Sequence, residues 1–264
     1  MNKYRFSILV WFLFRPFLYK QFFREAVSFM KRKEHPTLSY SEESLSWCHT
    51  NAYDEENALL QIDPSWSFLD FNNEFPLLVS DGFKLIESFD FNWGGQGNIS
   101  LNYSLAKHLN AEKILETGVA YGWSSLSLLT LLNRMNRGSL TSIDMPFWGT
   151  RHEDKIGCVV PSNFEERWNL IRLPDRDAIP KLLKKEKLFD LCHYDSDKSY
   201  DGKMWALPKL WSAIRDGGIL VCDDINDNLA FKHFCESEKI LPIIVRTFDS
   251  QFLKYVGIAV KTAL

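Results

Sequence analysis

The sequence predicts an α/β protein built on a Rossmann-like, mostly parallel sheet of seven strands, with helices on both faces and a helical extension at the N-terminus. Three observations support this fold class. Short apolar runs of strand length recur from residue 113 onward. The first five runs are separated by segments long enough for crossover helices, which is typical of a parallel sheet. Only a few residues separate the last two runs, which is typical of a hairpin and not of a parallel crossover.

The seven expected strands are short apolar runs of strand length. In chain order they are "KILETG", "LTSIDMP", "NLIRLPD", "LFDLCHYD", "GILVCDDI", "PIIVRTFD" and "KYVGIAVK". Only a few residues, "SQF", lie between the last two runs, whereas a parallel crossover needs about a dozen residues. The last strand is therefore predicted to return antiparallel, as the second arm of a hairpin.

The chain divides into a helical N-terminal extension, residues 1–75, and a main domain, residues 76–264. Within the extension, residues 37–62 are predicted to form a helix. In the main domain, "GGQG" at residues 94–97 predicts a loop before another helix, "ISLNYSLAKHL".

Residues 1–34 are basic and very aromatic. Their uncharged run, residues 6–14, is far shorter than the roughly 20 apolar residues that span a bilayer, and no small-residue cleavage site follows it. Two alternatives remain for this segment. It packs against protein, either on its own domain or in a homodimer, or it makes a peripheral contact with a membrane surface through its lysines and arginines.

Composition excludes several classes of protein. The net charge of −3, from 31 basic and 34 acidic side chains, provides no overall field that would recruit nucleic acid. The five cysteines are scattered, odd in number and contain no CxxC pair, so neither a disulfide framework nor a zinc knuckle is indicated. We therefore expect a protein of the reducing cytoplasm, with the inner face of the membrane as the place of any peripheral contact.

Acidic residues close the first five expected strands. They are Glu116, Asp144, Asp175, Asp195 and the pair Asp223 and Asp224. In an open parallel sheet, ligands bind outside the carboxyl ends of the strands, so acids at all five ends predict a shared site. The alternative for any one of them is a helix cap or a solvated loop acid.

The stretch "ETGVAYGWSS", residues 116–125, follows the first of these strands and opens a helix. Gly118 permits a tight turn, and Gly122 is expected to permit close approach of the backbone to a ligand. The stretch is neither a GxGxxG fingerprint nor a P-loop, so it does not indicate pyrophosphate binding.

In order and spacing, "ILETGVAYGWSS", "LTSIDMP", "YDSDKSY" and "RDGGILVCDDIND" resemble the motifs of class I S-adenosylmethionine (SAM) dependent methyltransferases. The resemblance covers about residues 94–262 and is strongest to the bacterial branch that includes macrocin-type O-methyltransferases. It implies SAM as the cofactor. Its methionine moiety would be surrounded by Glu116, Gly118 and Gly122, its ribose held by Asp144, and its adenine end placed near Met145 and Asp175. The full set of implied cofactor contacts is Glu116, Gly118, Tyr121, Gly122, Ser124, Asp144, Met145, Asp175 and Asp195.

The sequence also resembles the metal-dependent catechol and caffeoyl-CoA O-methyltransferases. That resemblance implies a divalent metal, Mg²⁺ or Ca²⁺, held by Asp195, Asp223 and Asp224, and a catalytic role for Asp195 and Lys198. As a general base, Lys198 needs a lowered pKa. Many bacterial relatives carry histidine at this position, which leaves the identity of the base open. In the alternative interpretation, Asp195 and Asp197 merely cap the helix that follows.

Other side chains near the expected site have less definite assignments. His193 is expected to be a packed core histidine that alternates to another face of the strand, away from Asp195. His152 and Arg151 lie in a loop that either reaches the ligand or is solvated. The aromatic residues expected around the pocket mouth are Trp93, Tyr121, Trp123, Phe147 and Trp148.

The leading functional hypothesis is a SAM-dependent O-methyltransferase acting on a hydroxyl of a small molecule or glycan. A second hypothesis is an NAD-dependent oxidoreductase on a similar sheet, which the missing GxGxxG fingerprint disfavours. A third is a noncatalytic membrane or assembly protein that retains the fold.

Overall fold

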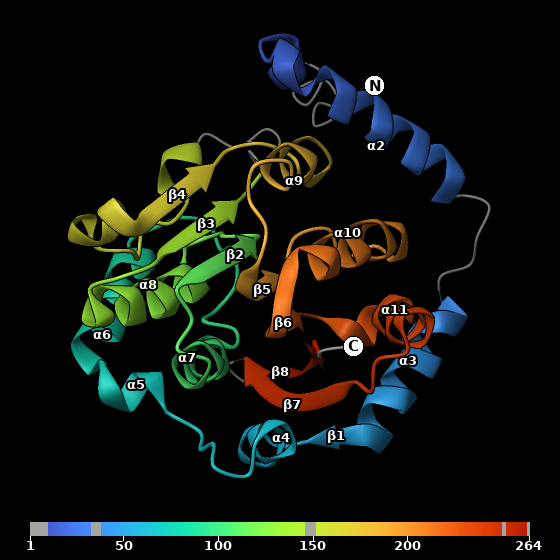
Figure 1. Ribbon diagram of the computed structural model, residues 1–264. Coiled ribbons are helices and arrows are strands. Elements are labelled where there is room, and N and C mark those ends of the chain that lie inside the picture. Colours follow the sequence, from blue (N-terminus) through green and yellow to red (C-terminus); the bar gives the residue numbers. More distant parts are fainter. Residues whose placement is uncertain (1–9, 33–37, 146–151, 250–251, 263–264) are drawn as a thin grey trace.

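The computed structural model describes residues 10–32, 38–145, 152–249 and 252–262 (Figure 1). Its centre is one sheet with the strand order β1-β7-β8-β6-β5-β2-β3-β4. The strands are β1 (Ala52–Tyr53), β2 (Lys113–Thr117), β3 (Ser139–Ile143), β4 (Trp168–Ile171), β5 (Phe189–Tyr194), β6 (Ile214–Cys222), β7 (Ile243–Asp249) and β8 (Phe252–Val260).

All seven predicted strands are confirmed, as is the fold class. Strands β2 to β6 run parallel to their neighbours in this group, and β8 runs antiparallel to both β6 and β7. The predicted hairpin at the end of the chain is therefore present. Because the parallel strands share one carboxyl edge, the acids that follow them come together there.

Helices cover both faces of the sheet (Figure 1). The alternation of side chains along β2 shows the two layers, since Ile114 contributes to one apolar core and Leu115 to the other. The first core is covered by α4 (Glu55–Ile62), α5 (Phe71–Glu74), α6 (Pro76–Glu87), α7 (Ile99–His108) and α8 (Trp123–Met135). The second is covered by α3 (Leu38–Asn51), α9 (Asp175–Leu182), α10 (Tyr200–Ala213) and α11 (Ala230–Glu238).

The single helix predicted for residues 37–62 is wrong in its middle. Helix α3 ends at Asn51, the next two residues form β1, and α4 starts at Glu55. Asp54 begins α4 as its N-cap, because its side chain accepts a hydrogen bond from the backbone N–H of Asn57 at 2.8 Å. Strand β1 pairs in parallel with β7, so the extension adds an edge to the sheet.

The first described residues form an arm that lies beside α9 and away from the rest of the extension (Figure 1). It comprises a short 3₁₀ helix, Pro16–Leu18, and helix α2 (Tyr19–Arg32), so the chain turns at Pro16. Trp11, Phe12 and Leu18 form a small apolar cluster of their own. None of the helices in the described part of the chain is both long and apolar enough to cross a bilayer.

Candidate active site

A cavity of about 550 Å³ opens at the carboxyl edge of the parallel strands. Its size lies within the range of small-molecule and cofactor sites. Most of the site residues predicted from the sequence line it: Gly118, Tyr121, Ser124, Asp144, Met145, Asp175, Asp195, Lys198 and Asp223. The other three, Glu116, Gly122 and Asp224, lie in the structure that supports the cavity wall.

The glycine turn after β2 packs closely against the backbone of two other segments of the chain. Gly118 has a φ of +82°, and a Cβ there would overlap the backbone carbonyl of Asp195. Gly122 has a φ of +93° and is the N-cap of α8. A Cβ on Gly122 would lie 2.8 Å from the Cα of Gly157. The close approach expected at Gly122 is therefore to another segment of the chain, and not to a ligand.

Asp144 ties this turn to the end of β3. Its Oδ2 accepts hydrogen bonds from the backbone N–H groups of Val119, at 2.8 Å, and Ala120, at 3.2 Å. Its Oδ1 accepts from the Nη1 of Arg172 at 2.8 Å. Burial outweighs these bonds and raises the pKa of Asp144 above its ordinary value. The carboxylate therefore organises the turn as well as facing the cavity beside Met145.

Asp175 lies at the first residue of α9 and faces the cavity. The Oγ of Ser196 donates to its carboxylate. Burial is the main reason that the pKa of Asp175 rises to about 6. A carboxyl group at a cofactor cavity thus changes its charge just below neutral pH.

Glu116 is fully buried behind the glycine turn. Its Oε2 accepts hydrogen bonds from the hydroxyls of Ser125, at 2.5 Å, and Ser142, at 2.7 Å. Its Oε1 lies 3.7 Å from the Nδ1 of His193. Glu116 is therefore placed to orient neighbouring side chains, which differs from the direct contact with the methionine moiety that the resemblance implies.

His193 is buried as expected, with 2% of its surface exposed, but it faces the cavity. The expectation that it alternates away from Asp195 is wrong, because residues two apart on a strand share a face. Its Nε2 lies 3.4 Å from the Oδ1 of Asp223. Burial opposes the charged imidazolium, but Asp223 and Glu116 outweigh it and raise the pKa of His193 to about 10.

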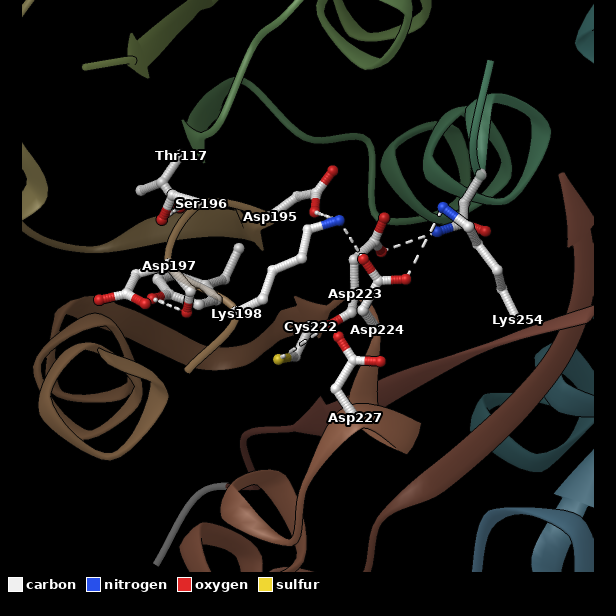
Figure 2. Close-up of polar contacts among 12 residues, drawn as sticks. Thr117, Asp195, Ser196, Asp197, Lys198, Cys222, Asp223, Asp224, Asp227 and Lys254 are labelled. Atoms are coloured by element: carbon white, nitrogen blue, oxygen red, sulfur yellow. Dashed lines mark hydrogen bonds and ion pairs between the residues drawn. The ribbon is translucent and has the colours of Figure 1, made fainter. Parts of the chain in front are cut away.

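An acid–lysine cluster, consisting of Asp195, Lys198, Asp223, Asp224 and Lys254, occupies the ends of β5 and β6 together with the facing strand β8 (Figure 2). The Nζ of Lys198 lies 3.6 Å from the Oδ1 of Asp195 and is hydrogen bonded to the Oδ2 of Asp224. Lys254 approaches the Oδ1 of Asp224 from the other side, at 3.7 Å. Two lysines thus form ion pairs with two of the three predicted metal ligands, Asp195 and Asp224.

The pKa values within this cluster depend on burial and on the mixture of charges. Burial, with Asp223 as the next cause, raises the pKa of Asp195 to about 7. The exposed part of the Asp195 side chain, 35%, opens into the cavity that it lines. Burial opposes the charged form of Lys198, but Asp195 and Asp224 raise its pKa above the ordinary value. Lys198 is therefore a cation here, and the lowered pKa that a lysine base needs is not present.

The carboxylates of Asp195, Asp223 and Asp224 are oxygen donors of the kind that Mg²⁺ and Ca²⁺ prefer. In this arrangement, however, the Lys198 ammonium lies where a cation would meet Asp195 and Asp224. Among the described residues, no group of three His, Cys, Asp or Glu side chains is arranged to hold a metal ion. These side chains, as placed, do not fit a metal.

The structure separates the two acids at the start of α10. Asp197 accepts a hydrogen bond from the backbone N–H of Ser199 at 3.0 Å, and Ser199 is the N-cap of the helix. Both acids line the cavity, but only Asp197 supports the start of the helix, as the capping alternative expected.

Sequence reasoning missed several cavity residues. Asn98 and Asn102 are 5% and 0% exposed, and the Oδ1 of Asn98 and both amide atoms of Asn102 have no hydrogen-bond partner within the described parts of the protein. Both line the cavity, so their polar atoms are available to a ligand. Asn98 follows the predicted "GGQG" loop, which was the only signal for it. Gln21, Arg176, Ser196 and Lys254 also line the cavity and belong to no recognisable motif.

Aromatic residues border the cavity in part as expected. Trp93, Tyr121 and Trp123 line it. The hydroxyl of Tyr121 donates to the carbonyl of Phe91 at 2.9 Å, which fixes the ring. His152 stacks on Phe91 with 4.1 Å between ring centroids and does not line the cavity. The expected residues Phe147, Trp148 and Arg151 lie outside the described residues.

Comparisons with known proteins agree with this fold. Residues 115–225 match the family model described as a methyltransferase domain. Among solved structures, an O-methyltransferase from Bacillus cereus in complex with SAH has a TM-score of 0.55 at 13% identity, over 81% of this chain and 100% of that chain. TomG from Streptomyces achromogenes, an O-methyltransferase involved in tomaymycin synthesis and solved with SAM, has a TM-score of 0.57 at 17% identity, over 80% and 100%. No curated protein matches the chain.

The chain has the fold of these SAM- and SAH-bound methyltransferases, and its residues 115–225 match a methyltransferase domain, which together support a SAM-dependent methyltransferase. The resemblance noted in the sequence is thereby confirmed. The cavity offers polar groups that suit a cofactor with many polar atoms: the unpartnered Oδ1 of Asn98, the unpartnered amide of Asn102, the turn at Gly118 and the carboxyl groups of Asp144 and Asp175.

Proposed function

We propose that the protein is an O-methyltransferase that methylates a hydroxyl of a small molecule or glycan. The observation that carries the proposal is the acid–lysine cluster beside the turn at Gly118. A carboxylate and an ammonium in one cavity can bind a hydroxyl, take up its proton and stabilise the negative charge that develops on its oxygen. The names of the structural neighbours support the same reaction.

In this proposal, SAM supplies the methyl group and leaves as S-adenosylhomocysteine. Asp195 accepts the hydrogen bond of the acceptor hydroxyl and takes its proton. Lys198 stays charged and stabilises the oxygen as the proton leaves. Asp224, whose pKa Lys198 holds below its usual value in spite of burial, keeps the ammonium in place. The buried amide of Asn98 donates to Asp223 at 2.7 Å and fixes the far side of the cluster.

The predicted divalent metal takes a different place in this proposal. We propose that Lys198 supplies the positive charge that the resemblance assigns to Mg²⁺ or Ca²⁺, since its ammonium pairs with two of the three predicted ligands. In the alternative form, Asp195, Asp223 and Asp224 would hold a divalent metal that would supply this positive charge, and Lys198 would serve as the predicted base.

The remaining predictions about the whole chain are kept as proposals. Residues 1–75 form an extension and residues 76–264 the catalytic domain, and the protein works in the cytoplasm. Exposed apolar side chains on the arm, among them Phe14, Phe17 and Phe23, support a contact with either an anionic membrane surface or a second copy of the chain.

The direct test is transfer of a labelled methyl group from SAM to a panel of catechols, other phenols and glycans, with the label located in the product. We expect label on oxygen, and a loss of about a hundredfold or more in rate for Asp195→Asn. Asp201→Asn, an exposed acid in the first turn of α10, is the matched control and should keep the rate. Label on nitrogen or carbon, or binding of NADH in preference to SAM, would contradict the proposal.

A further inference from the structure

Helix α2 of the N-terminal arm borders the cofactor cavity. Gln21 is on this helix and lines the cavity together with Asp175 and Arg176 from the start of α9. The two helices lie close together in Figure 1, although more than a hundred residues separate them in the sequence. The wall of the cavity at this end is therefore contributed in part by the extension.

One arginine fastens α2 to α9. The Nη2 of Arg24 donates to the Oδ1 of Asp177 at 2.8 Å, and its Nη1 donates to the Oδ2 at 3.1 Å. Such a bidentate ion pair fixes both the distance and the relative orientation of the two side chains. The same Nη1 also donates to the Oε1 of Gln21 at 3.2 Å. Arg24 thus holds the cavity-lining amide and the first turn of α9 in one arrangement.

Polar contacts are prominent in the attachment of the arm. Its small cluster of Trp11, Phe12 and Leu18 is separate from the two apolar cores of the sheet. A second anchor joins Arg15 to Glu153 at 2.9 Å. A segment outside the main cores opens more easily than one buried in them, so the two ion pairs of Arg24 and Arg15 are expected to help fix the position of the arm.

We propose that α2 is a wall of the SAM site, in which Gln21 contacts the bound cofactor and Arg24 with Asp177 forms the positioning pair that holds it there. The inference rests on the class of the enzyme and is independent of the acceptor. When the pair is formed, Gln21 stays at the end of the cavity near Asp175 and limits access of water. When the pair is broken, α2 moves away and the cofactor loses contacts.

The test uses the full-length protein and S-adenosylhomocysteine as the probe, with affinity from calorimetry and dissociation rate from stopped flow. Gln21→Ala and Arg24→Glu should each weaken binding about fivefold, mainly through faster dissociation. Asp177→Arg should do the same. Combining Arg24→Glu with Asp177→Arg should restore most of the affinity, because the pair is rebuilt with reversed charges.

The matched control is Lys20→Glu, which makes the same charge reversal at an exposed position of α2. We expect its affinity to equal that of the wild type. Unchanged affinity in Arg24→Glu, equal weakening in Lys20→Glu, or failure of the double variant to recover would overturn the proposal. Thermal unfolding separates the roles further, since a purely structural pair would lower the melting temperature in Arg24→Glu and leave the dissociation rate unchanged, which also overturns it.

Discussion

The guanidinium of Arg172 donates to Asp144 at 2.8 Å and so joins the residue after β4 to the carboxylate after β3. The other oxygen of Asp144 holds two backbone N–H groups of the glycine turn. The buried carboxylate of Asp144 thus links the glycine turn to Arg172. Substitutions of Asp144 and of Arg172 can separate the contributions of these two links to cofactor binding.

Asp144→Asn should weaken SAM binding by about tenfold or more, because a neutral amide loses the charge-assisted bonds to the turn and to Arg172. Arg172→Gln removes only one donor and should cost about threefold. Calorimetry with SAM measures both. Equal losses in the two variants would show that Arg172, and not the bonds to the turn, carries the effect.

Gly118→Ala should destabilise the protein by about 3 kcal/mol, because its backbone has a positive φ and a Cβ would overlap the carbonyl of Asp195. Gly94 offers a matched control, since its φ is +109° but nothing lies within 4 Å of its Cβ position. Gly94→Ala should cost about 1 kcal/mol. Urea unfolding gives both values, and similar costs would mean that the contact with Asp195 carries no energy.

The raised pKa of Asp175 makes stability depend on pH. Its value in the folded protein, about 6, lies above its ordinary value of 3.8, so the folded state binds a proton more tightly than the unfolded state does. The stability present below about pH 4 is therefore lost as the pH rises through about 6. Asp175→Asn should gain on the order of 2 kcal/mol relative to wild type at pH 7.5, and the gain should vanish near pH 4. Unfolding curves at both pH values check this, and a gain that is equal at the two would rule out the carboxyl group as its source.

Lys198 and a divalent metal are expected to exclude each other. Thermal unfolding of the wild type should not respond to millimolar Mg²⁺, because the ammonium already pairs with Asp195 and Asp224. Lys198→Met should lower the melting temperature by roughly 3 °C, and Mg²⁺ should restore it. Lys198→Arg, which keeps the charge, is the control. A wild type that is stabilised by Mg²⁺ would favour the metal predicted from the resemblance.

The sequence predicts the strands well because each β-strand is an apolar run between breaks, a pattern set by burial on both faces of the sheet. The same reasoning cannot find β1, since Ala52 and Tyr53 join the sheet through backbone pairing and have little apolar pattern. It also extends the helix through Asp54, whose side chain instead begins a new one. The first error arises because two residues pair with a distant strand, and the second because a local N-cap starts a new helix.

For the site, the predicted acids come together because parallel strands share an edge. The cavity residues that were missed lie on elements whose position depends on tertiary packing: Gln21 on the arm, Asn102 on α7 and Lys254 on β8. The burial of His193 was predicted, but the prediction that its side chain points away from Asp195 was wrong. The spacing of two residues on the strand already places both side chains on one face. Whether Lys198 or a metal neutralises the acids depends on distances between side chains, which no sequence pattern contains.

Strand β1 pairs with β7, and nearby Thr247 donates to Glu55 at 3.1 Å across 192 positions of the sequence. During synthesis, β1 leaves the ribosome long before β7, so the two strands cannot pair until most of the chain has been made. Contacts of such long range slow folding, because a large loop closes before any pairing energy is gained. The order of events in folding is thus expected to run from the centre of the sheet outward, with the edge formed by the extension completed last.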